Sequence, residues 1–231
     1  NNMNNYFKHL YLKLKNKIKV FELILQGIKI YQPATIQVRG NLSLGQKITM
    51  DCNITFNKNV TLSDGVKIDQ NCILEDCTIG KNVHIKSNSV VKGCVIEANS
   101  FIGPYARISP KTIIGSYAQI GNFVEIKNSV IGNNCRINHL TFIGDAQIEN
   151  NVTIGAGTIT CNFDGANTQK TYIEKEAFIG SGVYLIAPIR IGNNATIGSG
   201  STITKNAPPN KLTLARTEQT TNENWKGPKT I

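Results

Sequence analysis

Residues 101–126 read FIGPYARISPKTIIGSYAQIGNFVEI, and within this stretch an isoleucine returns at every sixth position. Two positions before several of these anchors lies a small or β-branched residue, such as Ala106 or Val124. Alternation over such short runs predicts β-strands, and the intervening glycines suit turns with a left-handed backbone. The stretch therefore predicts short strands separated by tight turns, with one isoleucine of each strand in the core.

The six-residue period continues on both sides of this stretch and covers most of the chain. Its anchors are Leu44, Met50, Phe56, Leu62, Ile68, Leu74, Ile79, Ile85, Val91, Ile96, Ile102, Ile108, Ile114, Ile120, Ile126, Ile131, Ile137, Ile143, Ile148, Ile154, Thr160, Ile173, Ile179, Leu185, Ile191, Ile197 and Ile203. Of these 27 positions only Thr160 is not apolar. A hexapeptide period is typical of a β-solenoid, so we expect an all-β fold.

Interruptions of the period indicate how many sides the solenoid has. Steps of five residues follow Leu74, Val91, Ile126 and Ile143, and a longer insertion follows Thr160. Counted along the chain, each of these anchors is a multiple of three, which predicts three strands per coil and a triangular prism. Nine coils then give a prism of roughly 40 Å, with all of the irregularity along one edge.

The chain divides into three expected segments. Residues 1–30 form a basic amphipathic helix with a linker, residues 31–206 form the β-helix with an inserted loop at 161–172, and residues 207–231 form a polar tail. The helix is indicated by apolar residues at helical spacing. These are Leu10, Leu14, Ile18, Phe21 and Leu25. Gly27 is a suitable stop.

Positive charge is concentrated in the predicted helix. The chain carries a net charge of +10, and residues 1–30 hold six lysines against Glu22, which places +5 of it there. Such a helix docks against its own domain or a neighbouring subunit, or it binds an anionic membrane surface. Nucleic-acid binding is disfavoured, because no aromatic platform accompanies the lysines. The apolar run around residues 21–25 is too short to span a bilayer.

Cysteine usage points to a reducing compartment. Six cysteines without a CxxC pair, and no signal peptide, predict a cytoplasmic protein without disulfides. Four of them occupy small inward slots of the repeat and are expected to be packing residues: Cys72, Cys77, Cys94 and Cys135. A zinc site would need three converging histidines, but His9 lies in the helix and His84 lies several coils from His139. No metal is therefore expected.

The irregular edge is the expected place for chemistry. Ser109, Lys127 and Gly144 follow stacked anchors there, and Cys161 begins the inserted loop. Glu125 and His139 are expected to point outward nearby. A lysine, a carboxylate, an imidazole and an amide-rich loop on one edge predict a functional site.

Three stretches carry a specific resemblance. They are GNFVEIK (residues 121–127), NHLTFIGDAQI (138–148) and NVTIGAGTITCNFDGAN (151–167). They resemble the C-terminal acetyltransferase domain of the bacterial bifunctional N-acetylglucosamine-1-phosphate uridylyltransferase/glucosamine-1-phosphate acetyltransferase, of the hexapeptide-repeat acyltransferase superfamily. The likeness runs from about Gly27 to Trp225. The family's nucleotidyltransferase domain has no counterpart in these residues, so we expect a piece of a longer protein or a stand-alone protein.

The resemblance implies a left-handed parallel β-helix and a homotrimer with active sites between subunits. It implies His139 as the general base, Glu125 as its orienting group, Asn162 as a ligand of the amine and acetyl group, and the Ala156 N–H as an oxyanion donor. It places four residues on the acetyl-CoA side: Ser181, Ser199, Arg216 and Trp225.

The acceptor side departs from the family pattern. Where the family has an arginine that grips the sugar phosphate, the chain has Ser109, and of that clamp only Lys127 remains. Two pocket tyrosines are replaced by Phe142 and Phe163. A substrate-binding asparagine is replaced by Thr153, and a phosphate-facing lysine by Thr168. Each lost charged hydrogen bond commonly costs ~1.5–3 kcal/mol, so we expect weaker phosphate binding.

These residues favour an acetyl-CoA-dependent N-acetyltransferase of an amino sugar that belongs to UDP-N-acetylglucosamine biosynthesis. Glucosamine 1-phosphate is the default acceptor, and a different, nucleotide-linked amino sugar is the alternative. A non-catalytic trimeric scaffold, which reaches a membrane through the basic helix, is the second alternative. A scaffold has no use for His139, Asn162 and Arg216 together, which favours the enzyme.

Overall fold

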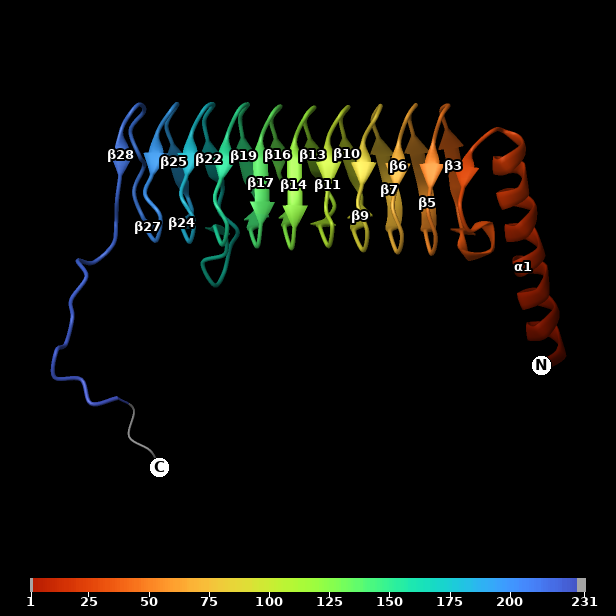
Figure 1. Ribbon diagram of the computed structural model, residues 1–231, viewed down its shortest axis with the longest axis horizontal. Helices are drawn as coiled ribbons and strands as arrows, with labels where there is room; N and C mark the ends of the chain where they lie inside the picture. The colour runs from red at the N-terminus through yellow and green to blue at the C-terminus, as the bar shows by residue number, and fades with distance from the viewer. Residues whose placement is uncertain (1, 228–231) are drawn as a thin grey trace.

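A long three-sided stack of parallel strands forms the body of the molecule, with one helix at one end and an extended tail at the other (Figure 1). The computed structural model describes residues 2–227, apart from the side chains of residues 2–6 and His9. The zinc argument from His9 therefore lies outside the described side chains. The fold is the left-handed parallel β-helix that the resemblance implies.

Face one of the prism holds eleven parallel strands. They are β1 (Lys29–Ile30), β4 (Thr49–Met50), β6 (Lys67–Ile68), β8 (His84–Ile85), β11 (Phe101–Ile102), β14 (Gln119–Asn122), β17 (Arg136–His139), β20 (Thr153–Ile154), β23 (Phe178–Ile179), β26 (Thr196–Ile197) and β28 (Leu212–Thr213). A short 3₁₀ turn, η1 (Pro33–Thr35), follows β1.

Faces two and three are joined into one sheet, because β5 (Thr55–Leu62) and β7 (Ile73–Ile79) run around the corner between them. Face two further contains β2 (Gln37–Val38), β9 (Val90–Lys92), β12 (Arg107–Ile108), β15 (Glu125–Lys127), β18 (Phe142–Gly144), β21 (Ile159–Cys161), β24 (Tyr184–Ile186) and β27 (Thr202–Ile203). Face three contains β3 (Asn41–Leu44), β10 (Cys94–Ile96), β13 (Thr112–Ile114), β16 (Val130–Ile131), β19 (Ala146–Ile148), β22 (Thr171–Ile173) and β25 (Ile189–Ile191).

The strand register confirms three strands per coil. Ile102 pairs with Ile120 on face one, and Ile108 pairs with Ile126 on face two. The anchors before every five-residue step and before the insertion lie on face two, so the irregularity follows the single corner between faces two and three. The stack has about ten turns, one more than the spacing predicts, because β1 and β2 precede the first anchor and β28 follows the last.

The anchor residues form one continuous core along the prism axis. Ile102, Ile126 and Ile143 have exposed fractions of 0%, and Thr160 is equally buried. The four cysteines predicted to be packing residues are buried and free, which confirms that prediction. Burial raises the pKa of the Cys72 thiol to about 11 and that of Cys77 to about 12, so neither is ionised near neutral pH.

Turns at the corner between faces one and two, here called the first corner, change character along the axis. In the lower coils Asn53, Asn71 and Asn88 adopt positive φ and form a ladder in which Asn53 Nδ2 donates to Asn71 Oδ1 and Asn71 Nδ2 to Asn88 Oδ1, both at 3.1 Å. In the next coils the same position holds Tyr105, Phe123 and Leu140, all with positive φ and all exposed. In the coils above them, the same position of the turn holds glycine.

Helix α1 (Asn2–Leu25) closes the end of the prism below β1 and ends just before Gly27, which has a φ of +83°. Its contacts to the β-helix come from Asn16, Lys19, Val20 and Leu23. The apolar residues that the helical spacing singled out point elsewhere: Leu10, Leu14, Ile18, Phe21 and Leu25 are all exposed. Docking of this stripe against its own domain is therefore not observed.

The tail beyond β28 extends away from the prism in Figure 1. Trp225 is 70% exposed in the single chain, so it does not pack onto a folded surface of the same copy. Among the described residues, no helix is long and apolar enough to cross a membrane.

Candidate active site

His139 lies at the end of β17, at the first corner, and its side chain is exposed. Its Nδ1 lies 2.5 Å from Oδ1 of Asn122, the residue directly below it in the neighbouring strand. An amide oxygen only accepts hydrogen bonds, so with the Asn122 amide in this orientation the neutral imidazole carries its proton on Nδ1 and keeps its lone pair on Nε2. The contact therefore orients the imidazole with a basic nitrogen facing away from Asn122.

Asn122 was not among the residues that sequence reasoning selected. Asn122 stands 17 residues before His139. This distance is one coil, because three six-residue repeats make 18 residues and this coil lacks one residue at the irregular corner. A search for polar residues one coil away from His139 would have found it. The signal was available in the sequence, but it depended on knowing which residues stack.

Residues of the expected catalytic and acetyl-CoA groups stack above His139 in one column. The register of β17, β20, β23 and β26 places Ala156, Ser181 and Ser199 on successive coils over His139. Parallel strands lie about 4.8 Å apart, so the column rises from the imidazole to Ser199 over roughly 14 Å. We call the set Asn122, His139, Ala156, Ser181 and Ser199 the catalytic column.

Ala156 offers a free backbone donor within this column. Its carbonyl accepts a hydrogen bond from the Gly182 N–H at 2.8 Å, and its own N–H makes no hydrogen bond within residues 2–227. It follows β20 and lies one coil above the imidazole. A free N–H one coil above an imidazole is a candidate donor to an oxyanion.

Arg216 lies at the top of the catalytic column. Its Nη1 donates a hydrogen bond to the Ser199 carbonyl at 3.0 Å, and the Ser181 N–H donates to Ser199 Oγ at 3.2 Å. The structure thus brings Ser181, Ser199 and Arg216 together, as the resemblance implies. Trp225 is 70% exposed and its backbone N–H donates to the Asn222 carbonyl at 3.2 Å, so it is not part of this group.

A second group of expected residues lies at the corner between faces two and three, here called the second corner. Ser109 directly follows β12, and Lys127 and Gly144 are the last residues of β15 and β18. Ser109 is only 7% exposed, whereas Lys127 is exposed. Gly144 leaves space for two neighbours: a Cβ at this position would lie 2.7 Å from Asn162 Nδ2 and 2.7 Å from the Phe142 ring. The glycine therefore allows the amide and the ring to approach each other.

Asn162 is fixed by a carboxylate. Its Nδ2 donates to Asp145 Oδ2 at 2.5 Å, and the Asn128 amide donates to the other oxygen of the same carboxylate. Asn162 also begins the inserted loop, where its carbonyl accepts from the Gln169 N–H at 2.6 Å. The expected ligand of the amine is thus held at both its side chain and its backbone.

The inserted loop beyond Asn162 forms a small hairpin that projects past the other turns (Figure 1). Phe163 and Thr168 form an isolated antiparallel bridge across it. Asp164 Oδ1 accepts hydrogen bonds from the N–H groups of Ala166 and Asn167, and these bonds hold the pKa of Asp164 below its usual value. The Phe163 ring at its base is 63% exposed.

His139 does not share the irregular corner with the lysine and the loop, contrary to expectation. It lies at the first corner, whereas Lys127 and Asn162 lie at the second, with the width of face two between them. Glu125, on face two, pairs with Arg107 rather than with His139: its Oε1 lies 3.3 Å from Arg107 Nε. The spacing already separates the two corners, because His139 follows the seventeenth anchor, whereas Lys127 and Gly144 follow anchors whose number is a multiple of three. Thr153 lies on face one, one coil above Arg136.

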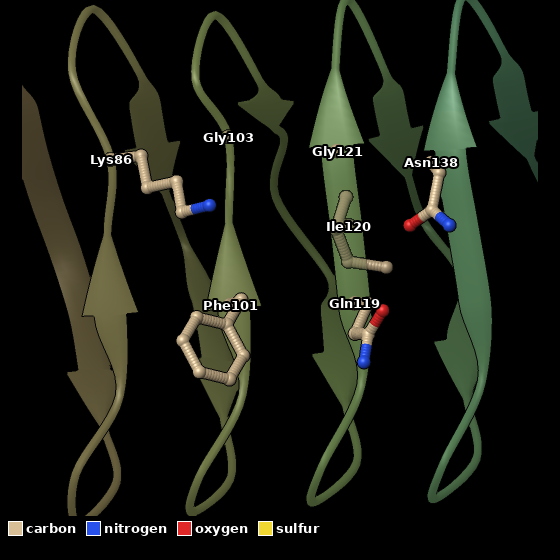
Figure 2. Close-up of a pocket in the computed structure, with 7 residues that line it drawn as sticks. All are labelled: Lys86, Phe101, Gly103, Gln119, Ile120, Gly121 and Asn138. Atoms are coloured by element: carbon tan, nitrogen blue, oxygen red, sulfur yellow. The ribbon is translucent and has the colours of Figure 1, made fainter.

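A shallow depression of about 260 Å³ lies on face one below His139. Its lining includes Lys86, Phe101, Gln119 and Asn138, whose side chains project from neighbouring coils in Figure 2. Asn138 directly precedes His139 in the chain. The depression therefore adjoins His139 and offers one ammonium group, one ring and two amides.

Comparisons with known proteins agree with this architecture. Residues 38–126 match the model of the GMPPB C-terminal domain, and residues 170–205 match the bacterial transferase hexapeptide model of six repeats. Among solved structures, an Arabidopsis UDP-N-acetylglucosamine acyltransferase superposes with a TM-score of 0.58 at 20% identity, covering 77% of this chain and 69% of that one. This likeness supports the fold.

Curated relatives are more similar. The chain is 47% identical over 206 residues to the bifunctional protein GlmU of Janthinobacterium sp. (strain Marseille), which covers 89% of this chain and 46% of the relative. It is 49% identical over 207 residues to GlmU of Ruthia magnifica, with 90% of this chain and 46% of the relative covered. The chain thus spans about half the length of the curated relatives it matches. It belongs to the hexapeptide-repeat transferases and corresponds to the C-terminal acetyltransferase domain of the GlmU proteins.

Proposed function

We propose that the protein transfers an acetyl group from acetyl-CoA to the amine of an amino sugar. The observation that carries this proposal is the catalytic column, which aligns an oriented base, a free N–H and the expected acetyl-CoA residues on one corner. A binding scaffold would not require an imidazole held in one tautomer. The family relationship to GlmU supports the same activity.

The chemistry follows from the contacts of His139. Nε2 of the imidazole takes a proton from the amine as its nitrogen attacks the thioester carbonyl. The negative charge that develops on the carbonyl oxygen is stabilised by the Ala156 N–H. The carbon–sulfur bond then breaks, and the imidazolium returns its proton to the departing thiolate of CoA. Asn122 keeps Nε2 directed at the amine throughout.

We infer that the active protein is a homotrimer whose sites lie between subunits. The base and the expected acceptor residues lie at two different corners of one chain, which is the distribution expected when one site takes each group from a different copy. Exposed aromatic side chains at the first corner support a trimer with sites between subunits. Tyr105 and Phe123 stack at 5.3 Å between ring centroids, both adopt positive φ, and both are exposed.

A left-handed backbone costs an ordinary residue roughly 1–2 kcal/mol, and an exposed aromatic side chain gains little in return. Other coils place asparagine or glycine at this turn. The bulky residues occur in the coils of Asn122 and His139 and the coil below them, so burial against another copy explains both their type and their place. Trp225 in the extended tail is a further group that a neighbouring copy would cover.

Glucosamine 1-phosphate is the default acceptor, and a nucleotide-linked amino sugar is the second candidate. Two observations favour the second. The phosphate clamp keeps only Lys127, and the depression beside His139 provides Phe101 for stacking and Lys86 as an extra cation. An acceptor larger than a sugar phosphate can use these groups.

A thiol-release assay tests the proposal. Acetyl-CoA is offered with glucosamine, glucosamine 1-phosphate and nucleotide-linked amino sugars, and free CoA thiol is measured. We expect release that depends on one of these amines and is lost in His139→Ala. Folded, trimeric protein that binds acetyl-CoA but releases no thiol with any amino sugar would contradict the proposed enzyme activity and favour a scaffold.

The Lys86→Ala variant tests the choice of acceptor. It should raise the KM for a nucleotide-linked amino sugar and leave the KM for free glucosamine unchanged.

A further inference from the structure

Helix α1 presents two distinct sides, and the C-terminal half of one of them docks against the first coil. Asn16 bonds the first coil twice: its Nδ2 donates to the Ile36 carbonyl at 2.8 Å, and its Oδ1 accepts from the Val38 N–H at 2.7 Å. Lys19 Nζ donates to the Gly40 carbonyl at 2.9 Å. Val20 and Leu23 are buried beside them. This side fixes the helix across the open end of the core.

The other side carries an unpartnered apolar stripe. Its members have exposed fractions between 52% and 71%: Leu10, Leu14, Ile18, Phe21 and Leu25. At 100° per residue these five side chains fall within about 80° of the helix circumference. Their mean direction lies about 150° from that of Asn16, Val20 and Leu23, so the stripe faces away from the prism along its axis.

Lysines border the stripe on both sides. On the helical wheel Lys13 and Lys17 lie along one border, and Lys8 and Lys15 lie along the other, all of them exposed. Glu22, the only acidic residue of α1, lies on the same border as Lys8 and Lys15, near the C-terminal end of the helix. An apolar stripe between two rows of lysines is the pattern of a helix that lies in the interface of an anionic bilayer.

We propose that α1 binds the surface of an anionic lipid membrane. The stripe enters the boundary between headgroups and acyl chains, and the bordering lysines contact lipid phosphates. The helix lies on the membrane, since no described helix can span one. A second copy of the chain is a poorer occupant, because pairing two stripes would bring lysine rows together with only Glu22 to offset them.

The position of α1 at one end of the prism determines how a trimer would meet the membrane and how far His139 would stand from it. In a trimer of parallel prisms the three α1 helices lie at the same end, so three stripes would meet one membrane and bind with avidity. His139 is six strand steps from β1, through β4, β6, β8, β11 and β14. At about 4.8 Å per step the imidazole stands roughly 29 Å above this end, beyond the headgroups. The membrane therefore locates the protein and does not deliver the acceptor.

Vesicle co-sedimentation of the 231-residue chain tests the proposal. Vesicles of phosphatidylcholine alone are compared with vesicles that also contain phosphatidylglycerol. We expect binding to the anionic vesicles that weakens with salt and little binding to the neutral ones. Lys13→Gln with Lys17→Gln should lower affinity by about 30-fold, because each lysine near an anionic surface contributes about one factor of five. Leu14→Glu with Ile18→Glu should abolish binding.

Matched controls distinguish a loss of vesicle binding that is specific to α1 from a loss of the fold or of total positive charge. Lys81→Gln with Lys175→Gln removes two exposed lysines from turns of the β-helix and should leave vesicle binding almost unchanged. All variants should keep the wild-type circular dichroism and thiol-release rate in the absence of vesicles. Absence of vesicle binding by folded wild-type chain, or equal losses in both lysine pairs, would overturn the proposal. So would a stripe variant that dissociates a larger assembly, because the stripe would then be an interface between copies.

Discussion

At the residue scale, the contact between His139 and Asn122 decides what the imidazole can do. The amide oxygen holds the proton of the neutral imidazole on Nδ1 and leaves the Nε2 lone pair free, as the proposed role of a general base requires. We therefore expect His139→Ala to lower kcat by ~10²–10⁴-fold while the KM for acetyl-CoA stays near its wild-type value. Steady-state kinetics with the preferred acceptor measures both. Near wild-type turnover in this variant would show that another group is the base.

Asn122 acts through His139, so its replacement should change the pH profile as well as the rate. In Asn122→Asp a carboxylate faces the imidazole and stabilises its charged form. The base works only when it is neutral, so the acidic limb of the kcat profile should move to higher pH. Asn122→Ala should lower kcat and leave that limb closer to its wild-type position. Equal profiles in all three proteins would contradict the positioning role.

At the element scale, the inserted loop depends on the ionised form of Asp164. Its folded-state pKa is depressed by the N–H groups of Asn167 and Ala166, so the stabilisation is present above the usual value of 3.8 and is lost as pH falls through the depressed one. We expect the amide proton resonances of Ala166 and Asn167 to titrate with a midpoint below 3.8. A midpoint at or above that value would show that these hydrogen bonds do not form.

The second corner and the loop together determine how well a phosphate is held. Lys127 is exposed there, and Thr168 is exposed on the loop. Ser109→Arg with Thr168→Lys should lower the KM for glucosamine 1-phosphate by ten-fold or more, because one good charged contact is worth at least ~1.4 kcal/mol. The KM for unphosphorylated glucosamine serves as the control. A wild-type protein already saturated by micromolar glucosamine 1-phosphate would show that other groups replace the clamp.

At the scale of the whole molecule, the first corner should be an interface between copies. Light scattering should give three times the chain mass of 25.3 kDa at micromolar concentration. Phe123→Glu should dissociate the trimer and abolish activity, because burial of a carboxylate in an apolar contact is unfavourable. The exposed Phe178, on face one, offers a matched control as Phe178→Glu. A wild-type mass near that of one chain would contradict the trimer.

The sequence by itself determined the three-sided β-helix. An apolar residue at every sixth position leaves one inward side chain per strand, and the five-residue steps fall only after anchors whose number along the chain is a multiple of three, which leaves only three strands per coil. It also determined which cysteines are packed inside, since Cys72 and Cys94 occupy slots that the pattern marks as inward. These are local properties, because spacing along the chain sets which way each side chain points.

Only the tertiary structure decided which distant residues meet. Asn122, His139, Ala156 and Ser181 are separated by 17, 17 and 25 residues, yet the strand pairing places them in one column. The coils differ in length because residues are missing or inserted at the second corner. Which residues stack at the first corner therefore depends on how whole coils pair with one another. The docking side of α1 was likewise decided by the tertiary structure. Asn16, Val20 and Leu23 contact the end of the prism, and the apolar stripe stays exposed. A helix offers several sides, and the surface on which it docks determines which one is buried.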